Sequence, residues 1–460
     1  MKKILIKGSR LVTEDGIQPA DLLVTGGKIE KIAPVIDNPD DAIEIIAENM
    51  YTMPGIIDPH VHLELPAYGT VSSDDFHSGS CAAAAGGVTT IIDFAIPKEG
   101  QTMIDRITEK KASADSKSVI DFSFHAQING WDEKTKTDME RTVEEGVSSF
   151  KIFMPATEGW GVGDSGLYEA LRQSAVIKSL VMVHAENSQL ARYFTEKLVS
   201  QGKTSISDYP GARPDFIEKE ALLRASLLAE EAGAPVYICH ISTGKAMLAV
   251  RELKRKGNNI YAETCPHYLL LSDDCYNRDD GFLFACCPPI RKKQDNYELW
   301  RGVLEGNIDV IGTDHCPFMR SQKEVNSGDF RRIPFGLPGV ETSLSLMFSE
   351  GVTKRDVRIE SLSGMMSTAP AKIFGFYPEK GTLREGSEAD IVIIDPEGTS
   401  RISSAETYSN CDWSPYEETE TAGSVNTTIS RGEIIFREGA LTAEKGRGRF
   451  IKRKKSFYCS

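Results

Sequence analysis

The sequence lacks long apolar runs, an excess of positive charge and the cysteine spacings of zinc fingers or disulfide frameworks. Its 67 Asp and Glu outnumber 53 Lys and Arg, and the formal net charge of −14 argues against a general nucleic-acid binder. No segment approaches the ~20 apolar residues of a membrane helix. The first apolar stretch is broken by Lys7, Ser9 and Arg10, so no signal peptide is predicted. We therefore expect no nucleic-acid partner and no membrane association.

The cysteines are scattered and odd in number. There are nine, at positions 81, 239, 265, 275, 286, 287, 316, 411 and 459. A chain of 460 residues can bury a substantial core without disulfides, so we interpret them as reduced thiols and expect a cytoplasmic protein. The basic run Lys445–Lys455 is predicted to be a solvated or subunit-contacting tail.

Both ends of the chain have the pattern of short strands separated by turns. Strand-like runs occur at Lys3–Ile6, near the N-terminus, and at Ala389–Ile394, and a hairpin is predicted over Asn426–Arg437. We infer one small domain, a composite β-sandwich built from residues 1–52 and 380–460, which includes the C-terminal tail.

Between these ends, short apolar strands alternate with helical segments, as in parallel α/β folds. Amphipathic helices are predicted at Phe216–Ala232 and Lys245–Lys256. The eight predicted strands are Gly55–Val61, Thr89–Phe94, Ile120–His125, Ser149–Phe153, Leu180–Val183, Val236–Cys239, Ile260–Glu263 and Asp309–Gly312. Eight such units predict a (β/α)₈ TIM-like barrel over residues 53–379.

Metal-binding residue types fall at the ends of the predicted barrel strands. His60 and His62 end the first strand, and their spacing of two places both imidazoles on one face. His184 ends the fifth strand, His240 the sixth, and Asp314 follows the eighth. Because active sites of such barrels lie at the C-terminal strand ends, these side chains are expected to converge. Imidazole is a preferred ligand of zinc and related metals, so a metal site is predicted.

Lys151 lies in the fourth predicted strand, flanked by Phe150 and Phe153. An ammonium group is costly to bury between aromatic rings. A neutral amine there can react with carbon dioxide to form a carbamate, a bidentate anion able to bridge two cations. The alternative is a lysine that reaches solvent or an acidic side chain.

The remaining histidines are weaker candidates. His267 and His315 are expected to line the pocket or to be hydrogen-bonded core residues, and His125 belongs to the same open class. His77 lies in a polar stretch and is predicted to be a surface residue. Asp58 is a candidate support for the metal ligands or a structural residue at the strand end.

Several long motifs resemble those of the cyclic amidohydrolases, in particular the hydantoinase and dihydropyrimidinase group. The first covers residues 55–66, with the sequence GIIDPHVHLELP. Further matches are GTVSSDDF at 69–76, GGVTT at 86–90, MVHAEN at 182–187, HIS at 240–242 and GTDHCPF at 312–318. The resemblance covers nearly the whole chain.

This resemblance implies a two-metal hydrolase that opens the ring of hydantoin- or dihydropyrimidine-type small molecules. In the family pattern His60, His62 and Asp314 bind the more buried metal, His184 and His240 bind the other, and Lys151, as N6-carboxylysine, bridges both. The metals are usually zinc, with manganese or cobalt as substitutes. A metal-bridging hydroxide attacks the ring carbonyl, and Asp314 is the catalytic proton carrier. The resemblance also implies a homotetramer.

The chain departs from the family pattern at three substrate-contacting positions. The tyrosine expected five residues after Lys151 is Ala156, and only the shorter Thr157 could offer a hydroxyl nearby. An expected serine is Cys287, and an expected asparagine is Phe335. In the family these last two positions hold the ring largely through backbone groups, so Thr157, Cys287 and Phe335 are the candidate substrate contacts.

Three other functions are weighed. An allantoinase, or another cyclic-ureide hydrolase, would share the metal site and likewise lack the tyrosine. A non-enzymatic scaffold related to dihydropyrimidinase would have no need for the six retained ligand positions. A nucleotide-binding protein is suggested by Ser242–Lys245, but the glycine required earlier in a phosphate loop is Cys239.

Overall fold

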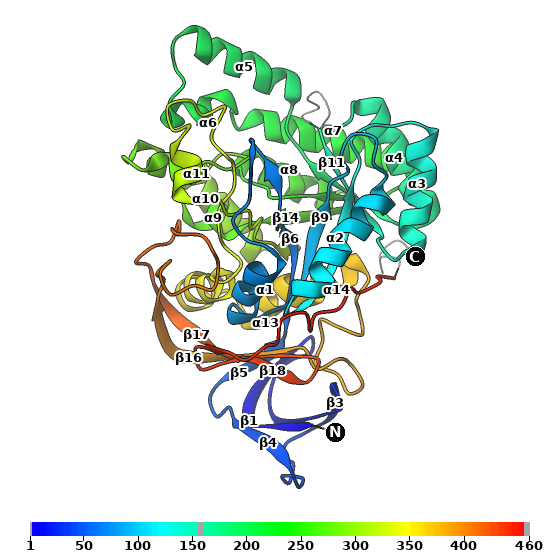
Figure 1. Ribbon diagram of the computed structural model, residues 1–460, viewed down its shortest axis with the longest axis vertical. Coiled ribbons are helices and arrows are strands. Elements are labelled where there is room, and N and C mark those ends of the chain that lie inside the picture. The colour runs from blue at the N-terminus through cyan, green and yellow to red at the C-terminus, as the bar shows by residue number, and fades with distance from the viewer. Residues whose placement is uncertain (1, 155–160, 455–460) are drawn as a thin grey trace.

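The computed structural model describes residues 2–154 and 161–454, and its larger part is a parallel barrel (Figure 1). Its eight strands are β6 (Ile56–Val61), β9 (Val88–Ala95), β10 (Asp121–Gln127), β11 (Ser149–Phe153), β12 (Leu180–His184), β13 (Val236–Ile238), β14 (Ile260–Thr264) and β15 (Val310–Ile311). They pair in chain order. Parallel strands are buried on both faces, which explains their continuous apolar runs. The predicted barrel and its eight strands are confirmed.

The first and last strands meet through the segment that follows β15. The His62 N–H donates to the His315 carbonyl at 2.8 Å, and the His315 N–H donates to the His60 carbonyl at 3.3 Å. Val61 and His315 form a parallel bridge at the same place. The seam that nearly closes the barrel is therefore made by the residues that surround the candidate metal ligands.

Helices cover the outside of the barrel. They are α1 (Phe76–Ala85), α2 (Met103–Lys117), α3 (Glu133–Glu144), α4 (Asp164–Ile177), α5 (Ser188–Ser200), α6 (Tyr209–Ala212), α7 (Phe216–Ala232), α8 (Gly244–Arg255), α9 (Pro266–Leu270), α10 (Lys293–Leu304), α11 (Arg320–Glu324), α12 (Ser343–Met347), α13 (Ile359–Ser363) and α14 (Ala369–Phe374). The two predicted helices correspond to α7 and α8. Among the described residues, no helix combines the length and the apolar character needed to cross a bilayer.

The two chain ends form a second, mostly antiparallel sheet of nine strands, below the barrel in Figure 1. Its strands are β1 (Lys3–Thr13), β2 (Gly16–Thr25), β3 (Lys28–Ala33), β4 (Ala42–Ile46), β5 (Tyr51–Pro54), β16 (Ile391–Arg401), β17 (Glu420–Ser430), β18 (Glu433–Arg437) and β19 (Ala440–Leu441). The two ends join where β5 pairs with β16, Pro54 opposite Ile391. The predicted β unit from both termini and its hairpin, β17–β18, are confirmed.

The described end of the basic tail, residues 446–454, packs against the barrel and buries Arg453, while Arg449, Lys452 and Lys454 stay exposed as predicted. Its contact with another subunit stays a prediction. The Ile451 N–H donates to the Phe122 carbonyl at 2.8 Å, and the ring of Phe450 stacks on Phe124 at 5.8 Å. Arg453 is only 5% exposed, and its Nε donates to Ser123 Oγ at 3.0 Å. Arg453 also donates to the Phe124 carbonyl, so it is anchored to β10 at two points, which sequence composition cannot reveal.

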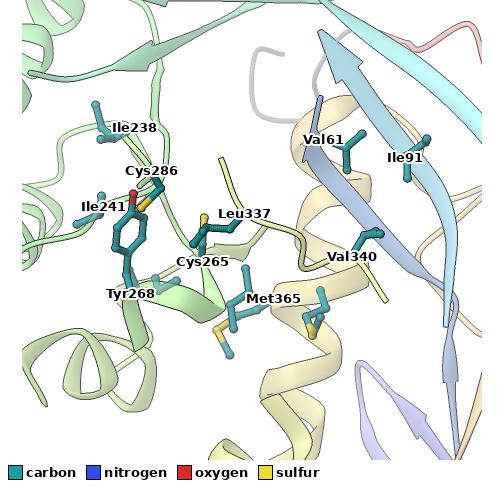
Figure 2. Packing of buried hydrophobic residues seen from close by; sticks show 14 of the residues in the cluster. Val61, Ile91, Ile238, Ile241, Cys265, Tyr268, Cys286, Leu337, Val340 and Met365 are labelled. Carbon is teal, nitrogen blue, oxygen red and sulfur yellow. The ribbon is translucent and has the colours of Figure 1, made fainter. Parts of the chain in front are cut away.

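Apolar and sulfur-containing side chains fill the space under the strand ends. Figure 2 shows Val61 and Ile91, from neighbouring strands, on one side of this cluster and Tyr268 with Cys286 on the other. The Tyr268 hydroxyl donates to the Pro288 carbonyl at 2.7 Å and so fixes the segment after Cys287. The eight cysteines within the described residues are free thiols.

A half-buried carboxyl joins the barrel to the segment before β17 and predicts a loss of stability at high pH. Glu341 accepts a hydrogen bond from the Tyr408 N–H at 2.9 Å, and burial raises the pKa of Glu341 from about 4.5 to about 8. Because the folded state holds this proton more tightly than the unfolded state, stability falls as pH rises from about 4.5 to about 8. Glu341→Gln is expected to raise the free energy of unfolding at pH 9 by on the order of 1–3 kcal/mol, without a gain at pH 4.

Urea denaturation at both pH values measures the effect, with Glu169→Gln on the exposed side of α4 as the matched control. An equal effect of Glu341→Gln at both pH values would contradict the assigned titration.

Candidate functional site

The predicted ligand residues converge at the C-terminal ends of the barrel strands. His60 lies in β6 and His62 directly after it, while Asp314 follows β15. On the other side of the site, His184 ends β12 and His240 follows β13. The rings of His60 and His240 lie 5.5 Å apart between centroids, so the two sides adjoin.

His60, His62 and Asp314 form the first group. Asp314 Oδ1 lies 3.2 Å from His60 Nε2 and 3.1 Å from His62 Nε2, and the possible ligand atoms of all three lie within 4.8 Å of one another. Burial lowers the pKa of His62. Burial alone would raise the pKa of Asp314, but the charge of His60 and the hydrogen bond from His62 hold it well below its usual range. The group therefore combines an ionised carboxylate with imidazole donors.

His184 and His240 form the second group. His184 Nδ1 and His240 Nε2 face each other at 3.0 Å. Burial lowers the pKa of both rings, and the positive charge of Lys151 lowers them further. Neutral imidazoles with converging nitrogen atoms are suited to share a cation.

Lys151 is buried at the same strand ends. It is 1% exposed, and its Nζ lies 5.2 Å from the ring centres of Phe94 and Phe153. Within the described residues, Nζ has no oxygen or nitrogen hydrogen-bond partner. Lys151 therefore reaches neither solvent nor an acidic side chain of the described residues, as the alternative would require.

The unsatisfied atoms of the site fit divalent cations. Lys151 Nζ, His62 Nδ1 and His267 Nε2 are all buried without a partner among the residues described. Buried polar atoms are rarely left in this state, because an unmade hydrogen bond costs about 1–3 kcal/mol. His240 and Asp314 also have φ values of 37° and 51°, an uncommon backbone conformation for non-glycine residues that can store strain at a functional site. The donor set of imidazoles and one carboxylate suits zinc and similar metals.

Two glutamates that the sequence reasoning missed orient the imidazoles. Glu263 Oε1 lies 2.6 Å from His60 Nδ1, and Glu186 Oε2 lies 2.8 Å from His184 Nε2. A carboxylate only accepts, so each histidine donates from that nitrogen and keeps the lone pair of the other ring nitrogen for a ligand. Arg213 pairs with Glu186 in turn. The available signals were an acidic residue at the end of the seventh strand and one two residues after His184.

Asp58 supports the loop that carries Asp314. Its Oδ2 accepts from Thr313 Oγ1 at 2.5 Å, and its Oδ1 accepts from the His60 N–H at 3.1 Å. Burial raises the pKa of Asp58 to about 6. The residue therefore links both ends of the barrel seam.

The other histidines have mostly structural contacts. His315 Nε2 lies 3.0 Å from Asp74 Oδ2, and His125 Nε2 lies 2.9 Å from the Pro59 carbonyl. His267 is buried near the first group, and burial lowers its pKa to about 4. His77 is partly buried in α1, with Nδ1 3.3 Å from the Lys117 carbonyl.

One of the three candidate substrate contacts, Cys287, lies beside the second group. Cys287 Sγ is 3.9 Å from His184 Nε2 and 3.5 Å from Glu186 Oε2. Phe335 packs on Tyr209 at 4.8 Å between ring centroids. Thr157 and Ala156 lie outside the described residues.

A buried ion pair holds the backbone after His62. Asp93 is hydrogen-bonded to Lys110 Nζ and accepts the Leu63 N–H at 2.8 Å. Burial raises the pKa of Asp93 and lowers that of Lys110, each against the attraction of the partner. Lys110→Met would leave a buried carboxylate unpaired, so the free energy of unfolding is expected to fall by about 3–5 kcal/mol.

Urea denaturation measures this loss. The double variant Asp93→Leu/Lys110→Met is expected to regain part of it, because the isolated charge is then gone. A single variant within about 1 kcal/mol of the unaltered protein would show that the pair is not needed.

Comparisons with known proteins extend over the whole chain. The sequence model of the amidohydrolase family matches residues 51–435. A D-hydantoinase from Geobacillus stearothermophilus is 38% identical over 457 residues, which cover 98% of this chain and 96% of that protein. A D-phenylhydantoinase from Escherichia coli O1:K1 is 37% identical over 455 residues, 98% of each chain. The solved structure of a dihydropyrimidinase from Brevibacillus agri NCHU1002 has a TM-score of 0.96 and 36% sequence identity, and the match covers 98% of this chain and 99% of that chain.

Proposed function

We propose a function from the premise that this chain belongs to the amidohydrolase family, among its hydantoinases and dihydropyrimidinases. It is a hydrolase that breaks the C–N bond of small cyclic amides, and hydantoin- or dihydropyrimidine-type rings are its proposed substrates. The observation that carries the proposal is the convergence of four histidines and Asp314 at one end of the barrel. Beside them lies the Lys151 amine, which has no oxygen or nitrogen partner within the part of the chain that the structure describes.

The same side chains would hold two divalent cations. His60, His62 and Asp314 would bind one cation, His184 and His240 the other, and Lys151, carboxylated by carbon dioxide, would bridge them. Two such cations supply Lewis acidity that lowers the pKa of water and polarises a carbonyl oxygen. Glu263 and Glu186 support this assignment because each fixes the tautomer of one histidine.

Asp314 is the proposed proton carrier of the reaction. As water oxygen adds to the ring carbonyl carbon, a carboxylate oxygen of Asp314 takes the water proton and passes it to the ring nitrogen while the C–N bond breaks. The ring-opened product has the protonated nitrogen at one end and a carboxylic acid at the other, and the acid releases the second water proton to solvent as it ionises. The contacts of Asp58 with Thr313 hold the Asp314 loop in place during this transfer.

Ring opening of hydantoin, dihydrouracil, allantoin and dihydroorotate, assayed side by side with recorded metal content, tests the proposal. Turnover of hydantoin or dihydrouracil would support it. Preference for allantoin would keep the chemistry and change the ring, an outcome favoured by Ala156 in place of the tyrosine. No turnover and substoichiometric metal would instead support the scaffold alternative.

The metal, the localisation, the oligomeric state and the domain division belong to the same proposal. We keep zinc, with manganese or cobalt as substitutes, as the metal, and a cytoplasmic homotetramer as the working form. The division into 1–52 with 380–460 and 53–379 also stays a prediction. Metal analysis of the purified protein tests the identity of the metal, and light scattering tests the tetramer.

A further inference from the structure

A lysine on the segment after Asp314 is fully buried without a counter-charge. Lys323 lies in α11 and is 0% exposed. Its Nζ donates to the carbonyls of Leu283 and Ala285, each at 2.8 Å, and lies 5.4 Å from the centre of the Trp413 ring. Within the described residues Lys323 pairs with no carboxylate, so its contacts are with backbone oxygen atoms and one aromatic ring.

The amine of Lys323 can hold both carbonyls whether or not it is protonated. Burial lowers the pKa of Lys323 to about 7. An ammonium group has three N–H donors and a neutral amine keeps two, so either form can serve the two carbonyl oxygens. Since no ion pair offsets the cost of burying this amine, its contribution is the position of the segment that it binds.

The Ala285 carbonyl joins this segment to a second one. Besides Lys323 Nζ it accepts the Gly336 N–H at 2.9 Å. Gly336 in turn packs closely on Cys316, two residues after Asp314, because a Cβ at position 336 would lie 2.2 Å from the Cys316 carbonyl oxygen. The junction at Ala285 therefore fixes two segments relative to the loop that carries Asp314.

The first of these segments borders the ligand residues. Cys287 is half-buried, and its Sγ lies 3.9 Å from His184 Nε2. Cys286, labelled in Figure 2, has its carbonyl held by the Tyr209 hydroxyl at 3.0 Å. A molecule bound at the ligand residues therefore lies against backbone that Lys323 and Tyr209 anchor at two successive carbonyls.

We propose that Lys323 is a positioning residue, which fixes the segments of Cys287 and Phe335 relative to each other and so determines how tightly the ring is held between them. The inference rests on the proposed function. The ligand residues belong to other strands and loops, so loss of the clamp should weaken binding of the substrate and of the transition state alike. Such a loss raises KM and leaves kcat nearly unchanged.

Lys323→Met tests the proposal because it keeps most of the buried chain length and removes the N–H donors. With whichever ring the unaltered enzyme opens, KM is expected to rise about tenfold, the size of effect that loss of positioned hydrogen bonds produces, while kcat stays within about threefold. The matched control is Lys203→Met, an exposed lysine, for which both constants should be unchanged. Metal content and melting temperature are measured on the same samples.

Tyr209→Phe supplies a second test that does not depend on the stability of Lys323→Met. It removes only the hydroxyl that holds the Cys286 carbonyl, and a rise in KM of about threefold with unchanged kcat is expected. If Lys323→Met does not fold, an unchanged KM in Tyr209→Phe would overturn the proposal.

Two results for a folded Lys323→Met would also overturn it. One is an unchanged KM, and the other is a fall in kcat together with loss of metal, which would place the effect at the metal ligands. Turnover by the unaltered enzyme separates these failures from failure of the proposed function, since a protein that opens none of the rings would overturn both.

Discussion

Lys151→Ala is expected to lower the kcat of ring opening at least about 1,000-fold and to leave the fold intact. The side chain is 1% exposed and lies between Phe94 and Phe153 without an oxygen or nitrogen partner in the described residues, so its truncation breaks no recorded ion pair. Loss of a bridging anion between two cations should lower both metal affinity and turnover. Steady-state kinetics and metal analysis of the same sample measure the two effects.

The matched control is Lys203→Ala, an exposed lysine in the loop after α5. Circular dichroism should show the same melting temperature, within a few degrees, for the control and for Lys151→Ala. Full activity of Lys151→Ala with two metals bound would contradict the bridging role.

Asp314→Asn is expected to lower kcat by about 100- to 10,000-fold, the range for loss of a positioned acid–base group. The pKa of Asp314 is well below its usual range because His60 and His62 surround it, so the carboxylate is ionised throughout the neutral pH range. An amide keeps the shape but cannot take a proton from water. Single-turnover kinetics separates the loss of chemistry from any loss of substrate binding.

Metal content distinguishes the two roles proposed for Asp314. If Asp314→Asn keeps both cations and still loses turnover, proton transfer is the affected step. Asp279→Asn, on an exposed turn, is the matched control. Turnover of Asp314→Asn equal to that of the control would remove Asp314 as the proton carrier.

Much of the barrel and of the ligand group could be predicted because each is encoded locally. A strand buried on both faces needs an apolar run, and β9 and β10 are buried at every position. His60, His62 and His184 follow or end such runs, so their common location follows from the direction of parallel strands. The boundaries were less exact: the predicted strand Asp309–Gly312 is reduced to Val310–Ile311.

Contacts between distant segments could not be predicted from the residues alone. Glu263 supports His60 across 203 residues, and no local pattern announces that pairing. The seam between β6 and His315 depends on how the barrel closes.

The packing of the tail on β10 has a consequence for synthesis on the ribosome. Arg453 binds Ser123, which precedes it by 330 residues. At about 5–20 residues per second, roughly 15–65 s pass between the two. During this interval the side of β10 that contains Phe122 and Phe124 lacks its cover, Phe450. The nascent barrel therefore presents an aromatic patch to chaperones until the last strand-like segment emerges, and a nonsense mutation near codon 445 would make that transient exposure permanent.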